Sequence, residues 1–250
     1  MSIFEDYAEY YDRLYGDKEY RSEVSYVGRL LAKYSRRKVR SVLSIGCGTG
    51  RYETLLVKKG LKLVGIDVSE KMISIARRRR LQDAQFLVGD AGSLDLGHKF
   101  DAVLSLFHVM SYQTSNDQLS KVISSVANHL KKGGLFIFDF WFGPAVLIEK
   151  PEVRVRKYED KNVEFIRVAK PCMVYEENVV EVAYEMLIHR RGSVSLSTLA
   201  EIHRMRYFFQ PELQYYLGEH GLTVLRFEEW KTSAQPSPKT WGVCCVALKN

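Results

Sequence analysis

Apolar runs and amphipathic stretches alternate through the centre of the chain. Short runs rich in Val, Ile, Leu and Phe predict strands at 42–45, 61–66, 85–88, 101–106 and 135–140. Before the predicted strand at 135–140, apolar residues recur at helical spacing from Leu119 to Leu130 and predict a helix. Ser115 with Gln118 predicts a capping box at the start of this helix. Strands this apolar, separated by helices, are typical of a parallel sheet covered on both faces. We therefore expect a Rossmann-like α/β fold.

The pattern changes after Pro151. Alternating or β-rich segments at 163–168, 179–189 and 195–208 follow one another, and they predict an antiparallel β insertion of about three strands. A short helix at 211–221 and two closing strands at 222–230 and 241–248 complete the pattern. We therefore expect three parts: an N-terminal helical lid (1–40), a Rossmann-like domain (41–150 and 209–250), and the antiparallel β insertion (151–208).

The N-terminal segment combines tyrosines with acidic residues. Phe4, Tyr7, Tyr11 and Leu14 share one face of a predicted helix. Such an aromatic stripe is most often packing. Tyrosine also supplies an apolar ring with a hydroxyl tip, which suits a pocket lid, and both interpretations stay open.

Composition places few limits on function. The chain has 250 residues and a net charge of +7, which suits an acidic or phosphorylated partner and equally a solvated basic surface. The four cysteines show no metal-ligand spacing, so we expect reduced thiols, a cytoplasmic protein and no metal site. Since no apolar run reaches membrane-spanning length and the first residues lack the apolar core of a signal peptide, we expect neither a membrane partner nor a leader.

A glycine-rich loop follows the first predicted strand. Gly46, Gly48 and Gly50 alternate with other residues directly after the run that begins at Val42, and a helix is expected from Tyr52. A strand, a glycine loop and a helix N-terminus form a cradle for a nucleotide cofactor. A bare turn needs fewer glycines than this. The spacing counts against a dinucleotide, because Arg51 occupies the place of the third glycine in the dinucleotide pattern.

Two aspartates follow the next strands. Asp67 ends the second predicted strand, where a carboxylate can accept both hydroxyls of a ribose or cap a helix. Asp90 ends the third, where its carboxylate or the backbone amide of Ala91 can meet an adenine edge. Together they indicate an adenosine-bearing ligand across the carboxyl ends of a parallel sheet.

These residues carry a resemblance to a known family. The segment Val42 to Gly50, with Asp67, Gly89-Asp90-Ala91 and Phe100-Asp101-Ala102-Val103, resembles the class I S-adenosylmethionine-dependent methyltransferases. The wider layout is similar to the small-molecule branch of that family, above all to the N,N-dimethyltransferases of nucleotide-linked amino sugars. It includes the start Tyr11-Asp12-Arg13-Leu14-Tyr15, the segment Phe107 to Tyr112, and the insertion. The resemblance implies a seven-stranded, mostly parallel sheet whose last strand is antiparallel.

The resemblance also assigns the cofactor residue by residue. The glycines would face the methionine part, Asp67 the ribose, Val68 and Met72 the adenine, and Leu106 the underside of the sulfonium. The full set of cofactor-binding candidates is Tyr20, Gly46, Cys47, Gly48, Gly50, Asp67, Val68, Met72, Asp90, Ala91 and Leu106.

One position departs from the family pattern. Ser44 stands where the family usually has an acidic residue that faces the ammonium end of S-adenosylmethionine. Serine forms hydrogen bonds but brings no charge. Recognition of the ammonium would therefore be shared with the loop backbone or with Tyr11, Tyr15 or Tyr20.

The resemblance implies methylation of a small molecule, most simply at an amino group such as that of a nucleotide-linked amino sugar. His108, Tyr15 and Tyr11 are the candidate catalytic residues, with Tyr112 and His203 as further residues able to reach the acceptor. O-methylation of a hydroxyl and a non-catalytic S-adenosylmethionine-binding protein stay open. The basic charge supports an RNA methyltransferase, but Phe107-His108 replaces the Pro-Pro-Tyr type motif, so no nucleic-acid partner is expected. The insertion would shape substrate choice and is the candidate surface for a homodimer.

Overall fold

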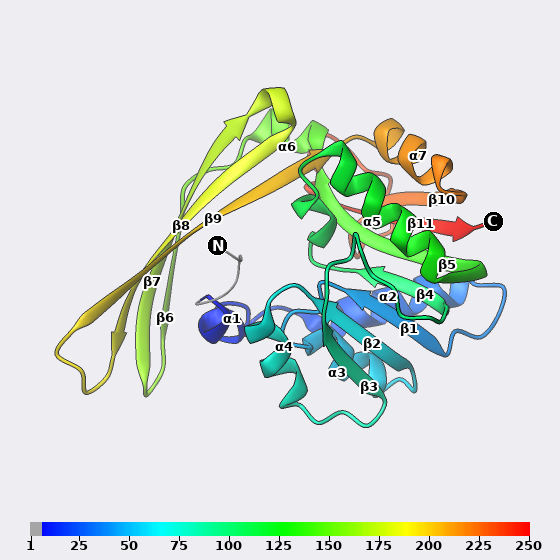
Figure 1. The fold of residues 1–250 in the computed structure, drawn as a ribbon. Helices are drawn as coiled ribbons and strands as arrows, with labels where there is room; N and C mark the ends of the chain where they lie inside the picture. The colour runs from blue at the N-terminus through cyan, green and yellow to red at the C-terminus, as the bar shows by residue number, and fades with distance from the viewer. Residues whose placement is uncertain (1–6) are drawn as a thin grey trace.

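A computed structural model describes residues 7–250 of the chain, in which an α/β layered body carries a long β ribbon to one side (Figure 1). The predicted lid residue Phe4 lies outside the described residues. The bounds of the main-sheet strands are β1 Ser41–Ile45, β2 Lys62–Asp67, β3 Ala84–Val88, β4 Phe100–Ser105, β5 Leu130–Phe142, β10 Leu222–Glu229 and β11 Gly242–Lys249.

The main sheet has the strand order β3-β2-β1-β4-β5-β11-β10. Strands β1 to β5 pair in parallel, whereas β11 runs antiparallel to both β5 and β10. The sequence prediction of a mostly parallel Rossmann-like sheet, with the last strand antiparallel, is confirmed. Because β1 and β4 are neighbours with crossovers in opposite directions, the loops after them flank the point where ligands bind in such sheets.

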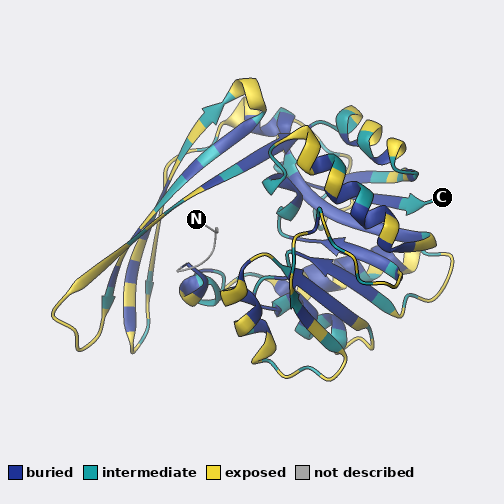
Figure 2. Cartoon of the chain, viewed as in Figure 1, coloured by how far each residue is buried: buried dark blue, intermediate teal, exposed yellow. Residues whose placement is uncertain are grey.

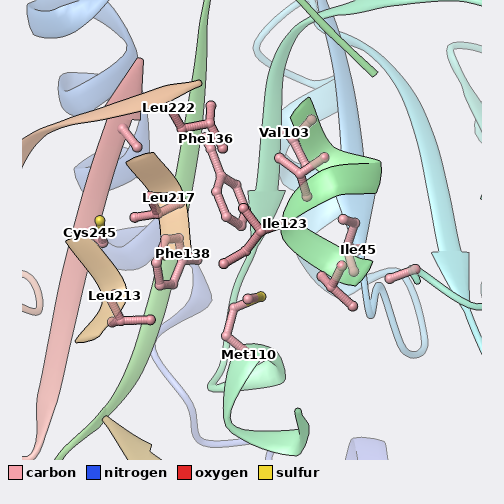
Figure 3. Close-up of a cluster of buried hydrophobic side chains, with 14 of the residues drawn as sticks. Ile45, Val103, Met110, Ile123, Phe136, Phe138, Leu213, Leu217, Leu222 and Cys245 are labelled. Atoms are coloured by element: carbon pink, nitrogen blue, oxygen red, sulfur yellow. The ribbon is translucent and has the colours of Figure 1, made fainter. Parts of the chain in front are cut away.

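Helices cover both faces of this sheet. On one face, Ile123 of α5 and Leu213 of α7 pack with Ile45, Val103 and Phe136 from the strands (Figure 3). On the other face, α2 and α3 pack against apolar side chains of β1, β4 and β11. The predicted capping box starts α5. The bounds are α2 Tyr20–Tyr34, α3 Arg51–Val57, α4 Glu70–Arg77, α5 Asn116–His129 and α7 Gln210–Glu219, with the short 3₁₀ helix η1 at Val109–Tyr112.

The β insertion has four antiparallel strands in the described part of the chain, not about three. They are β6 Arg154–Glu159, β7 Val163–Val174, β8 Val179–Arg190 and β9 Leu196–Phe208. The prediction missed β6 because its residues, Arg-Val-Arg-Lys-Tyr-Glu, are mostly charged and mostly exposed, so they show no apolar alternation (Figure 2). Strand β7 also continues past its predicted end through Pro171.

The insertion is joined to the Rossmann-like domain at one end. Trp141 and Phe142 at the end of β5 pair in parallel with Tyr207 and Phe208 of β9. Two short helical segments adjoin the strands, α6 (Gly143–Glu149) and η2 (Tyr175–Glu177). The long strand β9 therefore connects the two sheets directly (Figure 1).

The two N-terminal helices pack in different places. Helix α1 (Ala8–Leu14) buries Tyr10 and Leu14 against Phe165 and Met186 of the insertion, whereas α2 belongs to the core of the main sheet. We call residues 8–19, which are helix α1 and the loop after it, the cover. No helix in the described part of the chain is long and apolar enough to cross a membrane.

Candidate active site

One large cavity connects the glycine loop, the N-terminal tyrosines and the insertion. Its volume is about 1060 Å³, larger than most pockets for a single small ligand. The predicted site residues that line it are Tyr11, Tyr15, Tyr20, Gly46, Cys47, Gly48, Asp67, Val68, Met72, Asp90, Ala91, Leu106 and His108. Gly50 does not line it, because this residue sits at the start of α3 against Phe86.

The glycine loop presents bare backbone to the cavity. Gly46 has φ +65°, and a Cβ there would lie 2.5 Å from a methyl group of Val109, so a side chain does not fit. Gly48 has φ +53°, and a Cβ there would meet no protein atom within 4 Å. The space above Gly48 belongs to the cavity, which fits a ligand that approaches the backbone closely.

Asp67 holds the loop in this shape. Its carboxylate accepts hydrogen bonds from the backbone N–H groups of Gly48, at 2.8 Å, and Ser69, at 2.9 Å. Burial raises the pKa of Asp67, and these two hydrogen bonds oppose that rise. Its oxygens retain lone pairs for further donors such as ribose hydroxyls. Asp90 lies at the same cavity and accepts a hydrogen bond from the N–H of Gly92 at 2.7 Å.

A buried carboxyl group lies beside Ser44, where the family pattern expects an acid. The hydroxyl of Ser44 donates to Oε1 of Glu53 at 2.5 Å, and both residues are buried. Oε2 of Glu53 has no hydrogen-bond partner among the described residues. Burial raises the pKa of Glu53 to about 7. Sequence reasoning missed Glu53, because it lies on α3 and meets Ser44 only in the folded chain.

Asp12 of α1 contacts the glycine loop. Asp12 accepts a hydrogen bond from the hydroxyl of Thr49 at 2.6 Å, and it forms ion pairs with Arg51 at 3.1 Å and Arg79 at 2.7 Å. Arg51 also donates to the backbone carbonyl of Tyr15. These contacts attach the cover to the loop, and sequence reasoning missed them.

The predicted tyrosines meet at the junction between cover and insertion. The rings of Tyr11 and Tyr15 lie 4.8 Å apart, and the hydroxyl of Tyr15 accepts a hydrogen bond from Arg167 of β7 at 3.3 Å. Tyr20 lies further along, with the guanidinium of Arg51 at 5.1 Å from its ring centroid. Burial raises the pKa of Tyr20 to about 12.

His108 follows β4 in a left-handed backbone conformation, with φ +62°. Its Nδ1 lies 2.8 Å from Oδ2 of Asp139, which is 1% exposed, and its backbone N–H donates to the same oxygen. The carboxylate lies beside the imidazole, although Nδ1 does not form a hydrogen bond of good geometry with it, and His108 lines the cavity. Sequence reasoning missed Asp139, although a single acidic residue within the apolar run of β5 can be recognised in the sequence as a candidate functional residue.

A second histidine reaches the cavity from the insertion. Nδ1 of His203 lies 2.9 Å from the hydroxyl of Tyr112, and its Nε2 lies 3.0 Å from a carboxylate oxygen of Glu201. Burial raises the pKa of Tyr112 well above its usual value, so its phenol stays protonated. The cavity therefore has two imidazoles, each next to a carboxylate.

Comparison with known proteins identifies a methyltransferase domain within the chain. Residues 42–134 match a family described as methyltransferase domain. The DesVI crystal structure from Streptomyces venezuelae superposes with a TM-score of 0.81 and 25% identity, over 98% of each chain. The chain therefore carries a methyltransferase domain at residues 42–134 and shares the fold of DesVI over nearly its whole length.

Two curated relatives are sugar methyltransferases by name. A dTDP-3-amino-3,4,6-trideoxy-alpha-D-glucopyranose N,N-dimethyltransferase from Streptomyces venezuelae is 33% identical over a segment that covers 56% of this chain and 59% of that relative. A dTDP-3-amino-3,6-dideoxy-alpha-D-glucopyranose N,N-dimethyltransferase from Streptomyces fradiae is 26% identical over 87% of this chain and 84% of its own. S-adenosylmethionine is bound in a solved structure of the same fold, the amino pentose methyltransferase CalS10 from Micromonospora echinaspora, which superposes with a TM-score of 0.76 and 20% identity over 100% of this chain and 99% of its own. The open cradle above Gly48 fits this cofactor.

Proposed function

We propose that this methyltransferase transfers a methyl group to the amino group of a nucleotide-linked sugar. The main observation in support of this proposal is that one cavity runs from the glycine loop to His108 and Tyr112 and onward to the inner face of the insertion. Its volume of about 1060 Å³ leaves room for an acceptor beside the cofactor. The names of the two sugar N,N-dimethyltransferases support an amine as the acceptor group.

The protein's own part in the reaction is alignment and handling of a proton. Bound S-adenosylmethionine supplies an electrophilic methyl group on a sulfonium. The loop at Gly46 and Gly48 and the carboxylate of Asp67 would hold the cofactor, while Tyr11 and Tyr15 cover the cavity and exclude water. An amine must be neutral to attack, so its ammonium form must first lose a proton. His108, and His203 through Tyr112, are positioned to accept it.

The cofactor site is tested by filling the cradle. In Gly48→Leu the new side chain projects into the cavity, and we expect S-adenosylhomocysteine affinity, measured by calorimetry, to fall at least a hundredfold. Gly60→Leu is the matched control, because Gly60 also has positive φ and open space at Cβ but lies outside the cavity. Equal affinity in the two variants would contradict the assignment.

The acceptor class is tested with a panel of nucleotide-linked sugars that carry either an amine or only hydroxyls. We expect mass spectrometry to detect N-methylated products from the amines alone. A methylated hydroxyl would favour O-methylation, and tight cofactor binding without any product would favour a non-catalytic binding protein.

The homodimer, the cytoplasmic location and the domain limits at residues 40, 150 and 208 stay predictions from the sequence.

A further inference from the structure

Three arginines lie on the inner face of the insertion. Arg154 and Arg156 belong to β6 and Arg167 to β7, and all three line the cavity. In the strand register Arg156 stands directly opposite Arg167. Like charges opposite each other on neighbouring strands destabilise a sheet unless something lies between them to neutralise them.

The insertion itself does not neutralise this pair. Arg167 is 6% exposed and donates to the hydroxyls of Tyr7 and Tyr15, both neutral groups. Its Nε has no hydrogen-bond partner among the described residues. Arg156 reaches only the backbone carbonyl of Leu14, at 3.4 Å. Within the described residues neither arginine forms an ion pair with a carboxylate.

Other arginines near the cavity are neutralised within the protein. Arg51 and Arg79 share Asp12, and Arg204 pairs with Glu177 at 2.7 Å. Glu152 also lines the cavity, but within residues 7–250 it forms no ion pair with the three arginines. A buried guanidinium without an acid is costly, so the geometry of Arg167 indicates an anionic ligand.

We propose that Arg154, Arg156 and Arg167 bind the phosphate groups of the methyl acceptor. The proposal rests on the proposed function and names the part of the cavity that holds the nucleotide end. Guanidinium groups suit phosphate because they donate paired hydrogen bonds in a plane. The site also adjoins the reacting region: Arg167 contacts Tyr15, whose ring lies 5.1 Å from that of Phe107, the neighbour of His108.

The test measures binding of thymidine diphosphate, thymidine and inorganic pyrophosphate by calorimetry, with S-adenosylhomocysteine bound throughout. We expect Arg156→Gln to weaken thymidine diphosphate at least tenfold and to leave S-adenosylhomocysteine affinity unchanged. Lys157→Gln is the matched control, because Lys157 is exposed on the opposite face of the same strand and lies outside the cavity. Arg156 is the residue to change first, since replacing the buried Arg167 also removes packing.

Two results would overturn the proposal: equal diphosphate affinity in Arg156→Gln and Lys157→Gln, or a parent protein that binds thymidine as tightly as thymidine diphosphate. Pyrophosphate binding as tight as that of the nucleotide would keep the phosphate site and assign it to free phosphates. Failure of the proposed function looks different. In that case no amine is methylated, yet diphosphate binding still depends on Arg156.

Discussion

At the scale of single residues, Ser44 on β1 stands where the family pattern has an acidic residue, and the carboxyl group of Glu53 on α3 lies beside it. Ser44 and Glu53 share one short hydrogen bond in a buried position. The carboxyl is neutral in acidic solution, because burial disfavours its charge more strongly than the Ser44 hydrogen bond and nearby Arg79 favour it. Cys47 and Asp67 are the other titratable groups near it. Glu53 is therefore a residue that holds a proton in the folded state near neutral pH.

This predicts a pH dependence of stability. Folding raises the pKa of Glu53 from 4.5 to about 7, so its stabilising contribution is complete below about pH 4.5 and is lost as pH rises through about 7. One pKa unit corresponds to about 1.4 kcal/mol, so the loss is about 3 kcal/mol. In urea unfolding of the free protein, we expect Glu53→Gln to lose less stability than the parent between pH 5 and 8.

Glu70→Gln is the control for that experiment, since Glu70 is exposed in the first turn of α4. Its pH profile should follow the parent. Parallel profiles for the parent and Glu53→Gln would show that Glu53 does not titrate in this range.

Residues near in sequence to strand ends were predictable, whereas long-range partners were not. Gly48, Asp67 and Asp90 follow apolar strands directly, and the topology of a parallel sheet brings such positions to one edge. Arg167 meets Tyr7 across 160 positions, and only the fold of the insertion decides that meeting. No local pattern marks it.

At the scale of elements, the main sheet was predictable because each buried strand is a continuous apolar run. Strand β6 was not predictable, because an exposed edge strand does not show alternating apolar residues in its sequence. Helix α1 was predicted from its row of tyrosines, but the element on which it packs, the β insertion, was not predicted. Its apolar face packs on the insertion, while Asp12 on the same helix binds the glycine loop.

We therefore predict that Asp12 stabilises the closed cover. In Asp12→Asn the ion pairs to Arg51 and Arg79 are lost, and we expect about tenfold weaker S-adenosylhomocysteine binding, consistent with the loss of about 1.4 kcal/mol. Hydrogen exchange at residues 8–14 should become faster. Asp17→Asn, at an exposed position just beyond α1, should change neither quantity. Unchanged exchange in α1 would mean that Asp12 does not hold the cover.

At the scale of the whole molecule, the cavity depends on how two sheets meet. The β5–β9 pairing fixes the insertion to the main sheet, and the contact between Tyr112 and His203 crosses the same boundary. Glu201 then links His203 to the backbone N–H of Tyr7 beside α1. The cover, the insertion and the loop after β4 therefore converge on one imidazole.

This convergence leads to a kinetic prediction for His203→Gln. If His203 accepts the proton of the acceptor ammonium through Tyr112, kcat at saturating acceptor should fall about a hundredfold, the lower end of the usual range for proton-transfer catalysis. The deficit should shrink as pH rises and more of the acceptor is already neutral, while S-adenosylhomocysteine affinity stays unchanged. His189→Gln changes a partly exposed histidine of β8 that pairs with Glu164 outside the cavity, so it should behave as the parent. A uniform loss of acceptor affinity with unchanged kcat would instead assign His203 to packing, because packing alone gives no dependence on the protonation of the acceptor.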